Sequence, residues 1–220
     1  MRFVVALALA LALLAACGGP DAPPPDACEP TVLFLNRAGG MWDHGGRDDA
    51  SANLSLLVDV PRTLPPWPKP AAEWTELVGC MRTALARFPI SVTEADPAPA
   101  AHTEIVFTTE YWGGAGTTSI IPDSCRPGHE VEFVFGNALA TRTRACHVAL
   151  RAYAQMVANL SFGDHCEDVL NDQMDCTPDR FFTDLEANCL DASNQPTACR
   201  CGGTTQNSYR TLLAATTTCP

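Results

Sequence analysis

The sequence predicts a fold of the α+β class (mixed α/β), in which two main helices accompany a twisted sheet and an irregular part follows. Two segments, 71–88 and 141–161, repeat apolar residues at spacings of three and four, which is the period of a helix with one buried face. Shorter segments around the first helix are compactly apolar or alternate between apolar and polar residues, as strands do. From Gly163 onward the chain is polar and rich in cysteine, which predicts irregular structure held by disulfides.

The expected strands are short. The first, Thr31–Asn36, is a compact apolar run and reads as a buried strand. Alternation predicts half-buried strands over 90–94, 102–108 and 130–135, and a short strand or edge segment over 54–60. The Gly-rich stretch before Leu54 is expected to be loop, and the Pro-dense stretch 61–70 cannot be the interior of a helix.

The two main helices are defined by their apolar stripes. The first ends at Pro89 and carries Trp74, Leu77, Val78, Met81, Leu85 and Phe88. The second, with Thr141 or Thr143 as its expected cap, carries Ala145, Val148, Ala149, Ala152, Tyr153, Met156, Val157 and Leu160. A third, short helix is expected over 208–215.

The N-terminus has the pattern of a bacterial export signal. Arg2 precedes an unbroken apolar run of fourteen residues, which is too short to span a bilayer and suits the apolar region of a signal peptide. The run ends in Leu-Ala-Ala-Cys and resembles a lipobox, which implies a signal peptide over 1–16 and lipidation of Cys17. Residues 17–30 are rich in proline and read as a tether. The expected location is the envelope of a Gram-negative bacterium, with the outer membrane as the expected membrane.

Composition limits the remaining chain. Removal of residues 1–16 takes away Arg2 and moves the formal net charge from −11 to −12. This acidic balance argues against a nucleic-acid partner. The roughly 190 residues of 31–220, including the Cys-rich region 163–220, suit a single domain with a sizeable core.

Eleven cysteines are present. With Cys17 assigned to lipid, an even number remains, which in an exported chain predicts disulfides rather than a zinc-thiolate site. Cys166 and Cys176 are close enough in sequence to close a local loop, but the pairing as a whole cannot be read from sequence. The candidates are Cys28, Cys80, Cys125, Cys146, Cys166, Cys176, Cys189, Cys199, Cys201 and Cys219.

The end of the second main helix carries a family resemblance. Metzincin zinc peptidases have the motif HExxHxxGxxH there, in which three histidines bind zinc and the glutamate is the general base. Counting back from His165 places Gln155, Met156, Asn159 and Phe162 at the positions of the first His, the Glu, the second His and the Gly. The ending Phe-Gly-Asp-His is similar to the Gly-Leu-Asp-His of this group.

The resemblance extends over most of residues 31–215. The stretches LNRAGG, DDASANLS, FPISVTEADP, HTEIVF, IIPDSCRPGHEVEFVF, DHCED and CRCGGTTQNSYRTLL resemble a group of bacterial metzincin-like lipoproteins. The departures weigh against hydrolysis, because amides are weak zinc ligands and Met156 cannot accept a proton. The Met-turn of the family would fall near Leu170 or Met174. The resemblance therefore implies a peptidase-like fold with a degenerate zinc site and no catalytic residue.

Other candidate sites have competing interpretations. His165 alone is more often structural than a metal ligand. The helical stripe of His147, Arg151, Gln155 and Asn159 reads as a polar face, or alternatively as a surface that contacts peptide or glycan. The acidic residues Asp164, Glu167, Asp168, Asp172, Asp175 and Asp179 suit a solvated loop better than a calcium site, because they lack the regular calcium-loop spacing.

Three dipeptides also carry residues of catalytic or binding type. Cys146-His147 does not form a thiol nucleophile pair, since helix neighbours point about 100° apart. Asp43-His44 lies in a Gly-rich stretch without a serine motif, which argues against a hydrolase site there. Tyr111-Trp112 reads as loop packing, or alternatively as the rim of a cleft.

The expected function is an envelope lipoprotein that acts as a non-catalytic binding or structural module. Its expected partner is the membrane, through the lipid, and a protein or peptide ligand in the cleft is possible. No cofactor is expected. The alternative is a divergent zinc metallopeptidase with unconventional ligands around His165, and zinc is expected only under that alternative. A surface antigen without a cleft function also stays open.

Overall fold

The computed structural model describes residues 30–110, 112, 119–120, 125, 129–136, 142–172 and 180–217. The segments predicted to be signal peptide and tether, with Cys17 and Cys28, lie outside these ranges, as do Tyr111, Thr141, Cys176 and Cys219.

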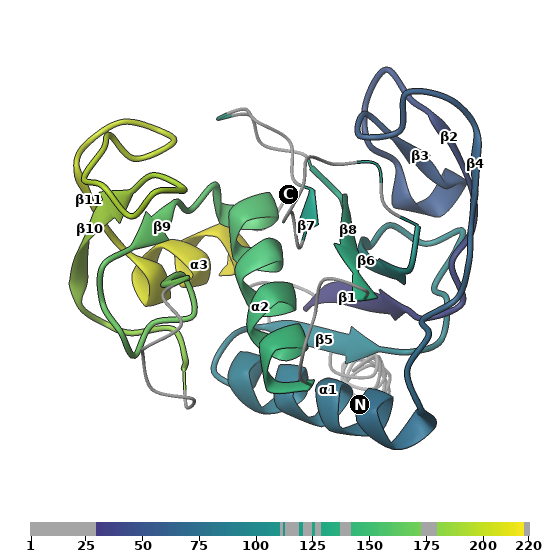
Figure 1. Cartoon of the computed structure of the whole chain (residues 1–220), viewed down its shortest axis with the longest axis horizontal. Helices are drawn as coiled ribbons and strands as arrows, with labels where there is room; N and C mark the ends of the chain where they lie inside the picture. The colour runs from purple at the N-terminus through teal and green to yellow at the C-terminus, as the bar shows by residue number, and fades with distance from the viewer. Residues whose placement is uncertain are drawn as a thin grey trace, which may run out of the picture.

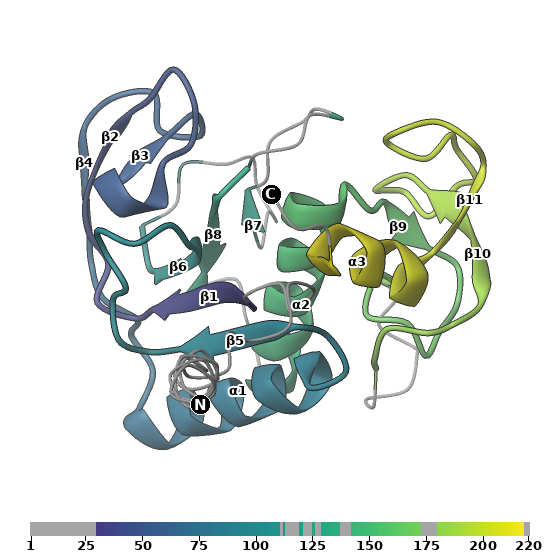
Figure 2. The same ribbon diagram turned by 180° about the vertical axis from the view of Figure 1, so that it is seen from behind.

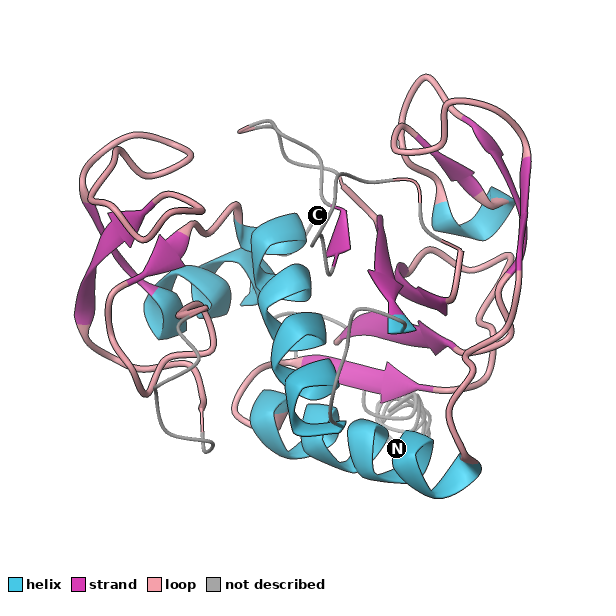
Figure 3. Cartoon of the chain, viewed as in Figure 1, coloured by secondary structure: helices cyan, strands magenta, loops and turns pink. Residues whose placement is uncertain are grey.

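The centre of the molecule is a five-stranded sheet (Figures 1 and 3) with the order β5-β1-β6-β8-β7. Its strands are β1 (Thr31–Asn36), β5 (Ile90–Thr93), β6 (Thr103–Thr108), β7 (Ser119–Ile120) and β8 (Val131–Phe135). Four of them run parallel, and the edge strand β7 pairs antiparallel to β8. The chain is therefore mixed α+β, as the sequence predicts, although the two-residue strand β7 was not anticipated.

Two helices cover one face of the sheet (Figure 1): α1 (Ala71–Leu85), the crossover between β1 and β5, and α2 (Arg142–Ala158), which follows β8. Alternate strand residues such as Leu33, Ile105 and Val134 form one core with the apolar stripes of both helices. The predicted stripes are thus buried as expected. The second helix is shorter than predicted, because it ends at Ala158 rather than Ser161.

A small sheet covers the opposite face. It has the order β3-β2-β4 and consists of β2 (Gly40–His44), β3 (Leu54–Ser55) and β4 (Arg62–Leu64), with the 3-10 turn η1 (Ala50–Ala52). Trp42 is fully buried against Phe133 of the central sheet, with ring centroids 5.4 Å apart. The expectation of loop over 37–53 was therefore wrong, because Trp42 supplies enough apolar surface to dock a strand despite the flanking glycines.

Burial on both faces overturns a second expectation. The strands β6 and β8 are buried along nearly their whole length, including Glu104 at 1% exposure and Glu132 at 0%. Alternation predicted half-buried strands with these glutamates facing solvent. Both carboxylates lie instead under a covering layer.

The C-terminal part packs beside α2, on the side away from the small sheet (Figure 2). It contains the antiparallel strands β9 (Phe162–Gly163), β10 (Glu186–Leu190) and β11 (Thr205–Asn207), followed by α3 (Ser208–Thr217). The predicted short helix is confirmed, and the region is more regular than the sequence suggested. None of the helices in the described ranges combines the length and hydropathy needed to cross a membrane.

Candidate functional site

The positions that resemble a zinc motif lie along the second half of α2 and in the chain that follows. Gln155 is buried on α2 at 3% exposure. Met156, at the position of the general base, is 1% exposed and belongs to the core between the helices and the sheet. A side chain in that place contributes to packing and has no access to solvent or substrate.

Asn159 does not lie on the helix. It adopts the left-handed conformation, with φ 53°, directly after the last helical residue. The N–H of Leu160 then reaches back to the carbonyl oxygen of Ala154, at 3.5 Å. Asparagine tolerates this conformation better than most residues and commonly ends helices in this way. The helix therefore ends at Ala158, one residue before the position that helical spacing would align with Gln155.

Phe162 stands where the family motif has a glycine. It belongs to β9 and pairs with Leu190. Its ring lies under the guanidinium of Arg151, with 5.0 Å between Cζ and the ring centroid. Arg151 is buried and also forms an ion pair with Asp172. The polar stripe of α2 is thus engaged in internal contacts at Arg151.

His165 is held against the C-terminal sheet. Its Nε2–H donates to the carbonyl oxygen of Glu186, at 3.0 Å. The neighbouring carboxylate of Asp164 accepts from the N–H and the side-chain amide of Asn188, at 2.9 and 2.6 Å. An imidazole nitrogen that carries a proton for a hydrogen bond cannot bind a metal through the same atom. In this arrangement the residue clips one loop to β10.

Asp168 makes the most side-chain hydrogen bonds of the described acidic residues in the stretch 164–172; Asp175 and Asp179 lie outside the described residues. The buried carboxylate of Asp168 accepts from the Leu170 N–H, the Thr183 N–H and hydroxyl, and the Ser208 hydroxyl, at 2.5–3.1 Å. These four donors join three segments that are distant in sequence, including the first residue of α3. Oδ1 accepts from Leu170 and Oδ2 accepts the other three hydrogens, so internal hydrogen bonds account for the burial of this carboxylate. Within the described ranges, no group of three His, Cys, Asp or Glu side chains is arranged to hold a metal ion.

Glu132 was not singled out from the sequence, yet among the described residues it is the carboxylate whose pKa burial raises most clearly. It is fully buried on β8 beneath α2, and neither oxygen makes a hydrogen bond of normal geometry to the described residues. Burial raises the pKa of Glu132 well above its ordinary value, and the Ser119 hydroxyl and the guanidinium groups of Arg151 and Arg200 offset this only in part. The carboxyl group is therefore biased toward its neutral form.

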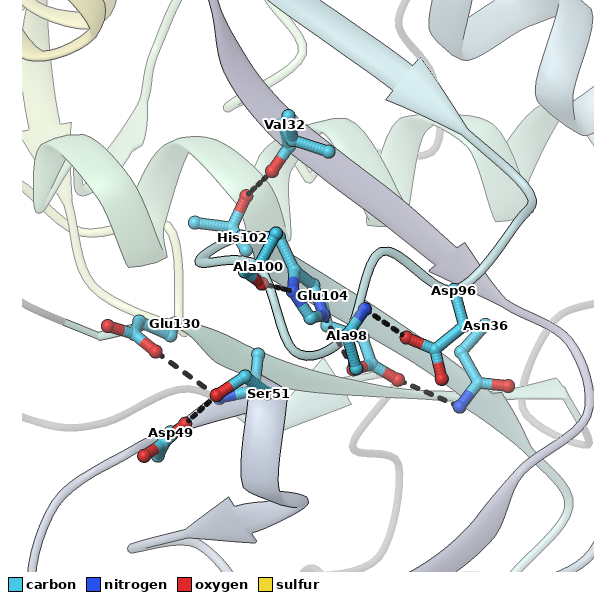
Figure 4. A network of polar contacts seen from close by, with 12 residues as sticks. Val32, Asn36, Asp49, Ser51, Asp96, Ala98, Ala100, His102, Glu104 and Glu130 are labelled. Atoms are coloured by element: carbon cyan, nitrogen blue, oxygen red, sulfur yellow. Dashed lines mark hydrogen bonds and ion pairs between the residues drawn. The ribbon is translucent and has the colours of Figure 1, made fainter.

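A second polar cluster lies on the other face of the sheet (Figure 4). Glu104 accepts from Asn36 Nδ2 at 2.7 Å and lies 3.5 Å from His102 Nε2. The other imidazole nitrogen, Nδ1, donates to the Ala100 carbonyl oxygen at 2.8 Å. Nε2 can therefore interact favourably with the Glu104 carboxylate only if a proton is present on either the imidazole or the carboxylate. Consistently, the pKa of His102 is raised, chiefly by Glu104, and the pKa of Glu104 is raised by burial.

Three disulfides join segments of the described chain. Cys80–Cys146 links α1 to α2, Cys125–Cys201 links the segment after β7 to the C-terminal part, and Cys189–Cys199 closes a local loop. Disulfide formation is thus confirmed for these six cysteines. Cys166 is also disulfide-bonded, and its partner is outside the described residues because the other described cysteines pair with one another. The thiol interpretation of Cys146-His147 falls away.

The remaining sequence candidates are structural in their contacts. His44 Nδ1 bonds the Val58 carbonyl oxygen at 2.7 Å within the small-sheet layer. Trp112 packs edge-on against Phe133 and Phe135 and donates from Nε1 to the Leu57 carbonyl oxygen at 3.1 Å. Trp112 therefore follows the loop-packing interpretation.

A pocket of 460 Å³ lies between α1, His147 of α2 and the segment 180–182. Sequence reasoning missed it, because it depends on where residues 180–182 return to the helix pair. Of the candidate residues taken from the sequence, His147 and the disulfide residue Cys80 line it.

In comparisons with known proteins, no family model, no curated protein and no solved structure matches this chain.

Proposed function

We propose that this protein is a lipid-anchored, non-catalytic binding or structural module built on a metzincin-like fold. The observation that carries the proposal is that the residues at the motif positions make structural contacts within the protein. Met156 packs in the core, Asn159 ends α2, and His165 donates from Nε2 to Glu186. The long helix after the last parallel strand, followed by a turn to His165, supports the fold part of the proposal.

The residues present do not fit a zinc ion. Two of the three ligand positions carry amides, and the third carries an imidazole whose Nε2 holds a proton for a backbone carbonyl. Amide groups bind zinc far more weakly than imidazole or thiolate. No step of a hydrolytic reaction is assigned to these residues.

Zinc content provides the test. The full-length protein, purified without chelator and passed through a desalting column, is expected to retain less than about 0.1 zinc per chain by atomic emission. The alternative, a divergent peptidase with its metal at His165, requires about one zinc per chain that His165→Ala removes. That result would overturn the proposal.

A gain-of-function pair sharpens the test. Gln155→His together with Asn159→His introduces two imidazoles and leaves the core residue Met156 unchanged. If the motif alignment is right, the double variant binds zinc with His165, whereas Gln155→His alone does not. A folded double variant without zinc affinity would contradict the metzincin-like assignment and would leave the loss of catalysis unaffected.

Anchoring is tested separately. We infer from the lipobox pattern that Cys17 carries the lipid and that the protein belongs to the envelope of a Gram-negative bacterium, in the outer membrane. Cys17→Ser is then expected to release the protein from the membrane fraction or to block its processing. A normally processed mutant that stays membrane-bound would contradict the inference.

A further inference from the structure

The pocket between α1 and α2 has one small-residue wall. Its α1 side consists of Gly79, Cys80, Thr83 and Ala84, which share one face of the helix. Its volume of 460 Å³ lies within the range of small-molecule sites in proteins, about 300–1,000 Å³. The Cys80–Cys146 disulfide forms part of the boundary and fixes the spacing of the two helices there.

Gly79 is the informative residue in this wall. It occupies the interior of α1, where glycine is the least favourable residue except for proline. A Cβ atom at this position would meet no other atom within 4 Å. Packing inside the protein therefore does not require a glycine at position 79. The lack of a side chain there keeps the space of the pocket open.

The remaining lining includes two guanidinium groups and an imidazole. Arg87, His147 and Arg180 line the pocket, and no acidic residue is among its described lining residues, although the whole chain has a net charge of −11. The guanidinium of Arg87 is held over the ring of Tyr209 at 4.2 Å, and Arg180 donates to the Asn171 carbonyl oxygen. Burial lowers the pKa of Arg180 from its ordinary value, and a bound anion would offset this burial cost.

The rest of the lining is aromatic. Phe88 and Phe182 contact each other edge to face, with centroids 5.4 Å apart, and both are almost fully buried. Phe181 beside them remains 46% exposed. An apolar group placed between these rings and the small-residue wall would be removed from water on both sides.

We propose that this pocket binds a small organic carboxylate with an aromatic or aliphatic body. The carboxylate meets Arg180, Arg87 and His147, and the apolar body lies against the phenylalanine rings and Gly79. This site is separate from the degenerate zinc positions, and the proposal holds whether or not those positions bind a metal.

Three probes of similar size separate the effect of charge from that of apolar contact. The full-length protein is titrated with 4-phenylbutyrate, 4-phenylbutanol and 4-phenylbutylamine by isothermal calorimetry. The carboxylate is expected to bind at least about tenfold more tightly than the alcohol, because charge-assisted hydrogen bonds to guanidinium are the stronger ones. The amine is expected not to bind. Equal affinities for the three probes, or no binding of the carboxylate up to about 10 mM, would overturn the proposal.

Two matched pairs of variants locate the site. Gly79→Leu fills the open space and is expected to abolish binding, while Gly79→Ala leaves most of the space and most of the affinity. Both variants replace a helix-interior glycine, so both should unfold at or above the wild-type temperature. Arg180→Gln is expected to lower carboxylate affinity about tenfold, whereas Arg47→Gln, exposed on the small-sheet side, should not change it. Unchanged binding by a folded Gly79→Leu variant would refute the assignment of the site.

Discussion

The two faces of the central sheet bury the same kind of residue with opposite consequences. Glu104 on β6 and Glu132 on β8 lie on neighbouring strands, and both are almost inaccessible to solvent. Glu104 faces the small-sheet layer, accepts a hydrogen bond from Asn36 and lies 3.5 Å from His102 Nε2 as an ion pair. Glu132 faces α2 and has no hydrogen bond of normal geometry among the described residues. A buried carboxylate stabilises a fold only where its partners are buried with it.

The two faces also differ in how their cover is attached. The helices are joined by the Cys80–Cys146 disulfide. Residues 31–79, which include the whole small-sheet layer, contain no cysteine. That layer is therefore held by non-covalent contacts, chiefly the packing of Trp42, Leu64 and Val58 on β6 and β8.

The largest expected effect concerns the covalent link. Replacing both cysteines, Cys80→Ser with Cys146→Ser, should lower the free energy of unfolding by about 4 kcal/mol, because the bridge spans 66 residues of sequence. Urea unfolding followed by circular dichroism measures the loss. The control, Cys189→Ser with Cys199→Ser, opens a 10-residue loop and should lose about 3 kcal/mol. A larger loss in the control would contradict the importance assigned to the helix-face link.

The next effect tests the partnered carboxylate. Glu104→Leu should lower the free energy of unfolding by about 3 kcal/mol, since it leaves His102 buried without its ionic partner and removes one of the two acceptors of Asn36 Nδ2. Glu132→Leu is the matched control and should be neutral or stabilising. Chemical denaturation of both variants at pH 6 gives the comparison. Equal losses would show that hydrogen bonding does not distinguish the two faces.

The unpartnered carboxylate should appear in the pH dependence of stability. The folded-state pKa of Glu132 lies above its ordinary value of 4.5, so the folded protein binds the extra proton and loses stability as pH rises from 4.5 through the folded pKa. Glu132→Gln cannot titrate. It should match the wild type at pH 4 and exceed it by about 1 kcal/mol or more at pH 8. A constant difference between the two proteins across this range would contradict the prediction.

The smallest effect is expected at His102. Its folded pKa is raised above 6.5, chiefly by the hydrogen bond to Glu104. The stabilisation is complete below pH 6.5 and is lost as pH rises through the folded pKa. His102→Gln keeps a donor but cannot titrate, so it should cost about 1 kcal/mol at pH 6 and flatten the decline above pH 6.5. Melting temperatures between pH 5 and pH 9 provide the measurement, and an unchanged decline would count against the pair.

Periodicity predicts the elements whose apolar residues face one well-defined layer. The stripe from Trp74 to Leu85 predicts α1, and the run Thr31–Asn36 predicts β1. The sequence pattern does not predict burial where a segment from elsewhere in the chain packs over a strand as a second layer. The alternation around Glu104 and Glu132 suggests a solvent face, because nothing local indicates that the small sheet and α2 will cover both sides.

The candidate site also combines features that local pattern predicts with features that depend on distant segments. Burial of Met156 could be anticipated, because it lies on the apolar stripe of its helix. The sequence indicates only weakly that the helix ends before Asn159, since asparagine commonly terminates helices. The hydrogen bond from His165 to Glu186 has no signal in the sequence, because it joins positions 21 residues apart. The pocket at Gly79 likewise depends on the return of residues 180–182.

The disulfides also give the chain a particular connectivity. The bridges Cys80–Cys146 and Cys125–Cys201 overlap in sequence, so their covalent rings share the stretch from 125 to 146. A single break of the backbone anywhere between residues 80 and 201 therefore leaves every atom connected through at least one sulfur bridge. Such a nicked molecule would migrate as one full-size species in electrophoresis until it is reduced.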